Sequence, residues 1–435
     1  MRAGYSDRID RLQIGEIAES VRSGAMSAAE VLEGHLARIE ERNGELNAVV
    51  ILDVDRARAA AAVRPQGPLA GVPFTVKEAI VVAGLPGREA SLLRPLEVGA
   101  QDATAVARLR AAGAILVGKT NTSELCAHPD SSNLVYGATR NPFDAARSAG
   151  GSSGGEGAAV ASGMSAFGLG SDYGGSVRAP ASFCGLAGMR PGVGFAPTDG
   201  HLPHRKPHFR EHLSTFGPLA PAVADLELVL AVLAGERVGF AAVPARVGIF
   251  RDVLDRTVSA ECAAAVESAA GSLACEIVDA TPPFQLAAEQ LFYAVSAAET
   301  QAIIGELGPL DEASPQLQWI ARTVEGAPPA PPDAAERFAA LESEAARWFE
   351  HVPVLLAPAA AEPAFALGGL EGNVFDLFHH CTLASALGLP AAVVPVAMSA
   401  TGLPIGVQVI GRRGHESEVL GVARAIEIGT GTIAR

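Results

Sequence analysis

The sequence predicts an α/β fold built around a large mixed β-sheet that is flanked by helices on both sides. Helical and strand patterns alternate from residue 69 onward, which is typical of sheets covered by helices. Hydrophobic residues make up 49% of the 435 residues, which is ample to fill a large core. Glycine is frequent, at 47 residues, and this indicates several tight backbone passages between the elements.

The first predicted unit is an N-terminal helical segment over residues 1–60. Apolar residues at roughly helical spacing predict a helix near its start, and these are Ile9, Leu12, Ile14, Ile17 and Val21. Ser27 followed by Glu30 has the spacing of a capping box, so a second helix begins at Ser27 and extends to about residue 45. Residues 47–53 are a short strand candidate. We expect these N-terminal helices to be available for contacts in a homodimer.

The second predicted unit spans 61–435 and contains the remaining alternation. Residues 69–79 predict a strand that runs into a turn, 102–113 a helix ended by glycine, and 114–120 a strand. The octapeptide GAILVGKT at 113–120 satisfies a phosphate-binding loop pattern, but its four central residues are apolar and predict a strand instead. Within this unit, the region of about 240–370 is predicted to be a variable, insertion-like α/β portion. It includes a charged helix at roughly 334–350.

Composition excludes several classes of function. A net charge of −15 argues against a nucleic-acid-binding surface and against docking on anionic lipid. The five cysteines are scattered without CxxC spacing, which favours a reducing cytoplasm over a disulfide framework. The N-terminus has mixed charges and no apolar core typical of a signal peptide. Residues 381–411 carry no charge, but three prolines interrupt them, so we predict buried strands and turns there, not a membrane helix.

Residues 201–212 form a basic, histidine-rich island in this acidic chain. Its histidines have irregular spacing and no HExxH motif occurs, so a solvated loop is favoured over a metal site; they are His201, His204, His208 and His212. A sharper hypothesis is that Arg205, Lys206 and Arg210 attract an anionic group of a substrate.

Three distant segments carry the residue types needed for acyl transfer. GVPFTVKEA places Lys77 in apolar surroundings, AGGSSGGEG places Ser152 and Ser153 among glycines, and GSDYGGSVR places Ser176 after two glycines. A serine hydroxyl needs a base within hydrogen-bond reach, and a lysine can be that base if burial keeps it neutral. Glycines next to Ser176 allow backbone N–H groups to converge on a developing oxyanion.

These segments resemble the signature of the amidase-signature family. The run from GGSSGG to GSDYGGSVRAP matches it, with Ser152 standing 24 residues before Ser176, and Lys77 lies in the family's G-x-P-x-x-x-K motif. The stretches at 117–125, 217–235 and 402–416 extend the resemblance over most of the chain, and it is weakest at about 240–370. The fold implied is therefore the amidase-signature fold.

The resemblance also implies roles for individual residues. Ser176 is the nucleophile, Ser152 relays a proton after a cis peptide bond, and Lys77 is the base. The backbone of Tyr173, Gly174, Gly175 and Ser176 forms the oxyanion hole. The positions implied to support this arrangement are Asp172, Arg178 and Ser153, and Cys126 lines the acyl side of the pocket. No metal or cofactor is implied, and the expected partner is a small-molecule amide.

The function that this resemblance implies is hydrolysis of a carbon–nitrogen bond through a serine acyl-enzyme. Glu78 and Glu156 depart from the commonest pattern and resemble the branch of fatty acid amide hydrolase and acetamidase. Phe378 stands where the glutaminase component of the tRNA-dependent glutamyl amidotransferase usually has Asp, which lowers the weight of that alternative. Two further alternatives stay open: an acyl transferase that uses the same triad, and a binding module without catalysis, which the retained lysine and serines disfavour.

Overall fold

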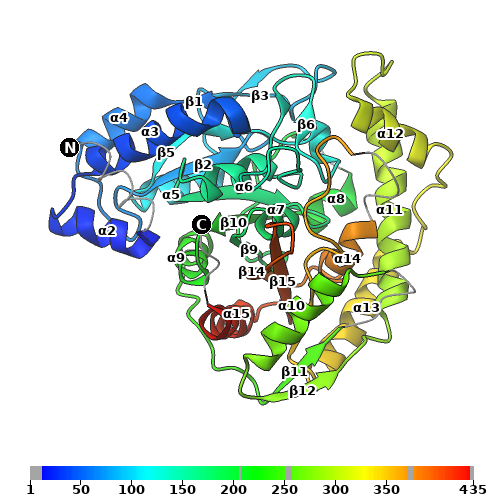
Figure 1. Cartoon of the computed structure of the whole chain (residues 1–435). Coiled ribbons are helices and arrows are strands. Elements are labelled where there is room, and N and C mark those ends of the chain that lie inside the picture. Colours follow the sequence, from blue (N-terminus) through cyan, green and yellow to red (C-terminus); the bar gives the residue numbers. More distant parts are fainter. Residues whose placement is uncertain (1–11, 205–206, 251–256, 370–375, 432–435) are drawn as a thin grey trace.

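The computed structural model describes residues 12–204, 207–250, 257–369 and 376–431. Its centre is an 11-stranded sheet with the order β1-β5-β2-β8-β10-β9-β14-β15-β13-β11-β12 (Figure 1). The strands of this sheet, in sequence order, are β1 (Val49–Leu52), β2 (Pro73–Lys77), β5 (Ile115–Thr120), β8 (Phe167–Asp172), β9 (Ala187–Arg190), β10 (Thr215–Ala220), β11 (Arg246–Ile249), β12 (Glu276–Asp279), β13 (Val354–Pro358), β14 (Ala391–Met398) and β15 (Pro404–Gly411). Two small ribbons pair β3 (Pro86–Gly87) with β4 (Glu97–Val98), and β6 (Ser132–Asn133) with β7 (Gly137–Ala138).

The sheet is mixed, as the sequence predicts. β2 runs parallel to both β5 and β8, and β11 runs parallel to β12 and β13. The middle strands pair in antiparallel fashion, for example β10 with β8 and β14 with β15. Every residue of β2 and β8 is buried, so the residues at the ends of these strands lie in the interior of the molecule.

Helices cover both faces of this sheet (Figure 1). They are α2 (Ile14–Ser23), α3 (Ala28–Leu46), α4 (Val54–Ala62), α5 (Thr104–Ala111), α6 (Gly154–Ala161), α7 (Arg178–Phe183), α8 (His208–Leu213), α9 (Val223–Ala234), α10 (Ala260–Gly271), α11 (Gln285–Gly305), α12 (Pro315–Val324), α13 (Ala334–Phe349), α14 (His379–Ala386) and α15 (Glu416–Thr430), with short turns of 3₁₀-helix at η1 (Glu124–Cys126) and η2 (Asp376–Phe378). No helix within the described ranges is both long and apolar enough to cross a membrane.

The second N-terminal helix begins where the sequence places it, whereas the first, α2, begins at Ile14, and Ile9 lies outside the described residues. Ser27 caps α3 by accepting a hydrogen bond from the Glu30 N–H, and the Glu30 carboxylate accepts one from the Ser27 N–H. This reciprocal pair satisfies two donors that the first turn of a helix otherwise leaves open. The octapeptide at 113–120 contains the strand β5 (Ile115–Thr120), as expected, and Lys119 is buried within this strand.

The region of about 240–370 contributes strands to the same sheet as the rest of the chain. β11, β12 and β13 form one end of the strand order, and β13 pairs with β15 from the C-terminal part. The helices α11, α12 and α13 gather on the side of the molecule away from α2, α3 and α4 (Figure 1). A second hydrophobic cluster lies beneath them and includes Phe250, Phe292, Phe338 and Phe349. The boundary at residue 60 and the insertion-like character of this region stay predictions.

Candidate active site

Lys77 is the last residue of β2, in the interior part of the sheet. Its side chain is completely buried, and its Nζ lies 2.6 Å from Ser152 Oγ and 3.0 Å from Ser171 Oγ. β2 pairs with β5 on one side and with β8 on the other, so Lys77 belongs to an interior strand of the sheet. The structure therefore joins Lys77 to Ser152 across 75 residues of sequence, as the resemblance implies.

Ser152 lies in a tight backbone passage just before α6. The Gly151–Ser152 peptide bond is cis, and the Ser152 carbonyl accepts hydrogen bonds from Thr122 Oγ1 at 2.7 Å and from Ser131 Oγ at 3.1 Å. A Cβ atom added at Gly151 would come within 2.6 Å of the His128 carbonyl oxygen, a distance too short for any side chain. Glycine is thus required there because the two backbones approach so closely.

Ser176 lies in the loop between β8 and α7 and is half-buried. The Ser153 N–H donates to the Ser176 carbonyl at 3.1 Å, which holds the two serine segments together. The Ser176 hydroxyl makes no hydrogen bond within the part of the chain that the structure describes. Catalytic hydrogen bonds are often completed only when a substrate is present, so this geometry leaves the hydroxyl available.

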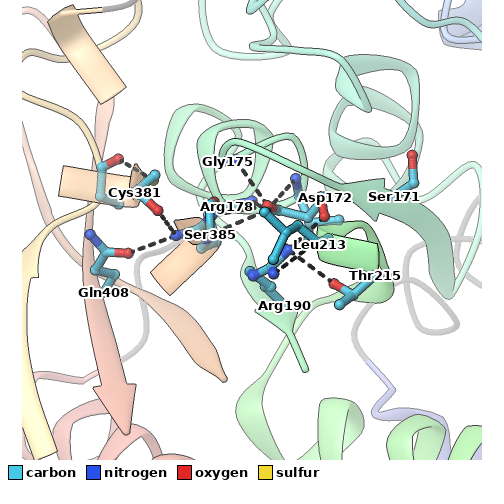
Figure 2. Close-up of polar contacts among 12 residues, drawn as sticks. Ser171, Asp172, Gly175, Arg178, Arg190, Leu213, Thr215, Cys381, Ser385 and Gln408 are labelled. Carbon is cyan, nitrogen blue, oxygen red and sulfur yellow. Dashed lines mark hydrogen bonds and ion pairs between the residues drawn. The ribbon is translucent and has the colours of Figure 1, made fainter. Parts of the chain in front are cut away.

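The loop that carries Ser176 is held by a buried ion cluster (Figure 2). The Asp172 carboxylate accepts from Arg178 Nη2 at 2.9 Å and from Arg178 Nε at 3.1 Å, and Arg190 Nη1 lies 3.6 Å from Asp172 Oδ1. All three side chains have no exposed surface. The two arginines also donate to acceptors on other elements, namely Cys381 O, Gln408 Oε1, Ser385 Oγ, Asp172 O, Thr215 Oγ1 and Leu213 O.

Two opposing effects set the pKa of Asp172. Burial by itself would raise it, but the charges of Arg178 and Arg190 outweigh burial and hold the pKa well below its usual range. Asp172 is therefore ionised near pH 7, between two arginines that are charged at that pH. Arg190 joins this cluster although the sequence did not single it out, and the supporting roles implied for Asp172, Arg178 and Ser153 stay predictions.

The backbone N–H groups of the loop divide into two sets. Those of Gly175 and Val177 donate to the Asp172 carboxylate, at 2.9 and 3.0 Å. Those of Tyr173, Gly174 and Ser176 have no hydrogen-bond acceptor within the described ranges. An anion next to Ser176 would find its donors in this second set, so the Gly175 N–H differs from the sequence expectation in being engaged already.

Two adjoining cavities expose these groups. The larger, of about 380 Å³, is lined by Cys126, the Tyr173–Ser176 loop and a largely apolar wall that includes Phe292, Ile320 and Phe378. The smaller, of about 40 Å³, is lined by Ser152, Ser171 and His201 among others. Four residues line both cavities: Cys126, Tyr173, Ser176 and Arg210. Cys126 thus lines both cavities, and its place on the acyl side of the pocket stays a prediction.

Burial controls the charge of the base and of its acidic neighbour. It lowers the pKa of Lys77, against opposing contributions from Cys126, Asp172 and Glu156. It raises the pKa of Glu156 to about 8, although Thr120 and Thr75 hydrogen-bond to the carboxyl group at 2.6 and 2.5 Å. Both shifts favour the neutral forms of these groups, and the Glu156 carboxyl is mostly protonated near pH 7.

Sequence reasoning missed a second branch of hydrogen bonds on Lys77. Ser171 Oγ, 3.0 Å from Lys77 Nζ, also lies 2.9 Å from His201 Nε2, and the other ring nitrogen of His201 faces the Leu202 carbonyl. Ser171 stands directly before Asp172 in the GSDYGGS motif, so its position was visible in the sequence. The partnership with His201 was not, because 30 residues separate the two.

The histidine-rich segment is partly the solvated loop that the sequence predicts, since His204, His208 and His212 are exposed. Residues 208–213 form α8, and His201 is half-buried next to Ser171. His204 Nε2 lies 2.9 Å from Glu97 Oε2. The ring centres of His208 and His212 are 4.1 Å apart. Among the described residues, no three His, Cys, Asp or Glu side chains converge on a point where a metal ion could bind. Arg205 and Lys206 lie outside the described residues.

Comparison with known proteins agrees with this architecture. The A-type subunit of glutamyl-tRNA(Gln) amidotransferase from Anaeromyxobacter sp. (strain K) is 31% identical over 479 residues, covering 96% of each chain. A solved structure described as an unexpected vestigial protein complex that reveals the evolutionary origins of an s-triazine catabolic enzyme is 30% identical, with a TM-score of 0.88, and covers 97% of this chain and 99% of that one. A 6-aminohexanoate cyclic dimer hydrolase bound to its substrate is 27% identical, with a TM-score of 0.85 and coverage of 96% and 97%.

The family model described as Amidase matches residues 30–420, a range that includes the lysine, both serines and the ion cluster. The resemblance drawn from the motifs is therefore confirmed, and the chain belongs to the amidase family.

Proposed function

We propose that this protein hydrolyses the carbon–nitrogen bond of a small-molecule amide through an acyl-enzyme on Ser176. The observation that carries the proposal is the fully buried Lys77 Nζ at 2.6 Å from Ser152 Oγ, in a segment joined to Ser176 by the Ser153–Ser176 backbone hydrogen bond. A buried amine of lowered pKa is a base, and Ser152 is the group positioned to pass a proton to it.

Acylation follows from this arrangement. Ser176 Oγ attacks the amide carbon while its proton passes to Ser152 Oγ, and the Ser152 proton passes to neutral Lys77. The negative charge that develops on the amide oxygen is stabilised by the free N–H groups of the Tyr173–Ser176 loop. The same relay then returns a proton to the leaving nitrogen, the carbon–nitrogen bond breaks, and an ester of Ser176 remains. Water attacks this ester by the same route and releases the carboxylic acid.

The Ser171–His201 branch supports the direction of this relay. A neutral amine has two N–H donors and one lone pair. If one N–H of Lys77 donates to Ser171 Oγ, and the Ser171 hydroxyl donates to His201 Nε2, the second N–H and the lone pair remain, and the lone pair can turn toward Ser152 to accept its proton. We assign Ser171 and His201 as positioning residues on this basis.

The test is release of ammonia or amine across a panel of small, aryl and long-chain amides. Wild type should turn over at least one class and show an acyl adduct by intact-mass spectrometry, and Ser176→Ala should do neither. Ser162→Ala, a change at the end of α6 outside both cavities, is the matched control and should retain turnover. Activity that survives in Ser176→Ala would contradict the assignment of the nucleophile.

A second candidate function is that of the glutaminase component of a tRNA-dependent amidotransferase. Its support is the 31% identity to the A-type amidotransferase subunits over nearly the whole chain. Phe378, at the position where the sequence comparison expects an acid, lines the larger cavity and favours a less polar acyl group. Glutamine hydrolysis that appears only with added partner chains would select this second function. Formation of a new amide when a free amine is added would select acyl transfer.

A further inference from the structure

We propose that Arg210 forms a carboxylate-binding subsite beside Ser176, so that the substrate amide bears an anionic group. This inference rests on the proposed hydrolysis, because it names the substrate class for the same site. Arg210 is one of the four residues that line both cavities, and Ser176 is another. The guanidinium group therefore borders the space that an amide attacked by Ser176 must occupy.

Arg210 is held in this position from two elements. The Glu299 carboxylate of α11 accepts hydrogen bonds from the Phe209 and Arg210 N–H groups, at 2.8 and 2.9 Å, and so anchors the start of α8. Arg210 Nη2 donates to Thr300 Oγ1 at 3.0 Å, and the guanidinium carbon lies 5.2 Å from the centre of the Tyr173 ring. A guanidinium fixed in this way loses little conformational entropy when it binds a ligand.

Most of the donors of Arg210 are unused by the protein. A guanidinium has five N–H donors, and the hydrogen bond to Thr300 is the one its side chain makes within the described residues. Its Nε is buried with no hydrogen-bond partner. Glu299 lies near enough to act electrostatically on Arg210, but its oxygens serve the backbone N–H groups, and Arg210 has no ion pair in the described part of the chain. An arginine with a planar fork of free donors is suited to a carboxylate.

The surrounding charges place an anion at Arg210. In the smaller cavity, Glu89 and Arg94 form an ion pair at 3.5 Å and offset each other. In the larger cavity, Asp376 is the other lining residue with a formal charge, and it disfavours an anion at its own position. Arg210 is thus a positive charge beside the nucleophile that has no ion-pair partner in the described part of the chain, and its free N–H donors face the cavities that Ser176 lines.

The experiment measures binding in a Ser176→Ala background, where turnover does not interfere. The probes are succinamate and its neutral analogue 4-oxopentanamide, which place the anion on the acyl side, and N-acetylglycine and N-(2-oxopropyl)acetamide, which place it on the amine side. Calorimetry should give a Kd about tenfold or more lower for the anion in one of the two pairs, the size expected for hydrogen bonds to a charged group.

Arg210→Gln should abolish this preference, and Arg210→Lys should retain part of it. Arg58→Gln, which removes an arginine paired with Glu33 outside both cavities, is the control and should retain the full preference. Kd values within twofold in both probe pairs, or a preference that survives Arg210→Gln, would overturn the subsite. Failure of the proposed hydrolysis would be seen separately, as wild-type protein that binds the anionic amide and does not cleave it.

Discussion

Replacing Asp172 by Asn tests whether the buried ion cluster stabilises the fold. The change preserves the shape of the side chain and removes the charge, which leaves Arg178 and Arg190 with no carboxylate partner and no exposed surface. Removing one partner of a buried ion pair typically costs about 3–5 kcal/mol, because the remaining charge stays buried and uncompensated. We expect a loss of this size in the free energy of unfolding, a large part of the roughly 5–15 kcal/mol available to a typical protein.

The pH dependence gives this prediction a second signature. The folded pKa of Asp172 is depressed below its ordinary value of 3.8, so its contribution is present above that value and is lost as the pH falls toward the folded pKa. The difference between wild type and Asp172→Asn should therefore be constant from pH 5 to pH 8 and should shrink below about pH 3.8.

Guanidinium unfolding monitored by circular dichroism measures both effects. Glu33→Gln is the control, because Glu33 and Arg58 form an ion pair at 2.6 Å whose side chains are 51% and 55% exposed. Exposed pairs of this kind contribute about 0–1 kcal/mol. If Asp172→Asn costs no more than Glu33→Gln at pH 7, the reasoning about the cluster is refuted.

Three other changes test separate parts of the structure. Glu156→Gln should weaken the pH dependence of stability. The pKa of Glu156 is raised from 4.5 to about 8, so wild type loses unfolding free energy as the pH rises between these values. The loss of unfolding free energy between pH 5 and pH 9 should therefore be smaller in the variant than in wild type. His201→Phe and Ser171→Ala should each lower kcat/KM by about tenfold, and the double variant should cost no more than the larger single effect; additive losses would separate the two residues. Ser314→Ala removes the cap that accepts from the Leu317 N–H at 3.2 Å on α12, and it should cost about 1 kcal/mol of unfolding free energy, with no loss contradicting the cap.

Local structure was predictable where a single short pattern specifies it. The capping box at Ser27 and Glu30 placed the start of α3, and the apolar run at 114–120 placed β5. The order of strands was not predictable in the same way. Hydrophobic periodicity and residue propensity indicate whether a segment is helix or strand, but not which strand it pairs with. The region of about 240–370 illustrates this, since β11 and β13 join the central sheet although their sequence resembles a separate portion.

The site shows the same division. The spacing of motifs brought Lys77, Ser152 and Ser176 to attention from the sequence alone, and the structure joins Lys77 directly to Ser152. The partners that complete the site come from distant segments without a signature of their own. Arg190 reaches Asp172 across 18 residues, and His201 reaches Ser171 across 30, so only the folded chain reveals them.

A lysine can act as a base here because neither nearby carboxyl group is able to stabilise its protonated form fully. Each of the Asp172 and Glu156 carboxylates raises the pKa of Lys77 when it is ionised, yet burial still lowers that pKa. The charge of Asp172 is offset by two arginines at short range, whereas Glu156 is neutral near pH 7 because its own pKa is raised to about 8. The two acids thus lose most of their electrostatic effect on Lys77 for different reasons. Asp172 is paired with arginines, and Glu156 is protonated. Glu156→Gln leaves this side chain neutral at every pH. The acid limb of the kcat/KM profile should therefore lie at the same or a lower pH in the variant than in wild type. A shift of that limb to higher pH would contradict this account of the base.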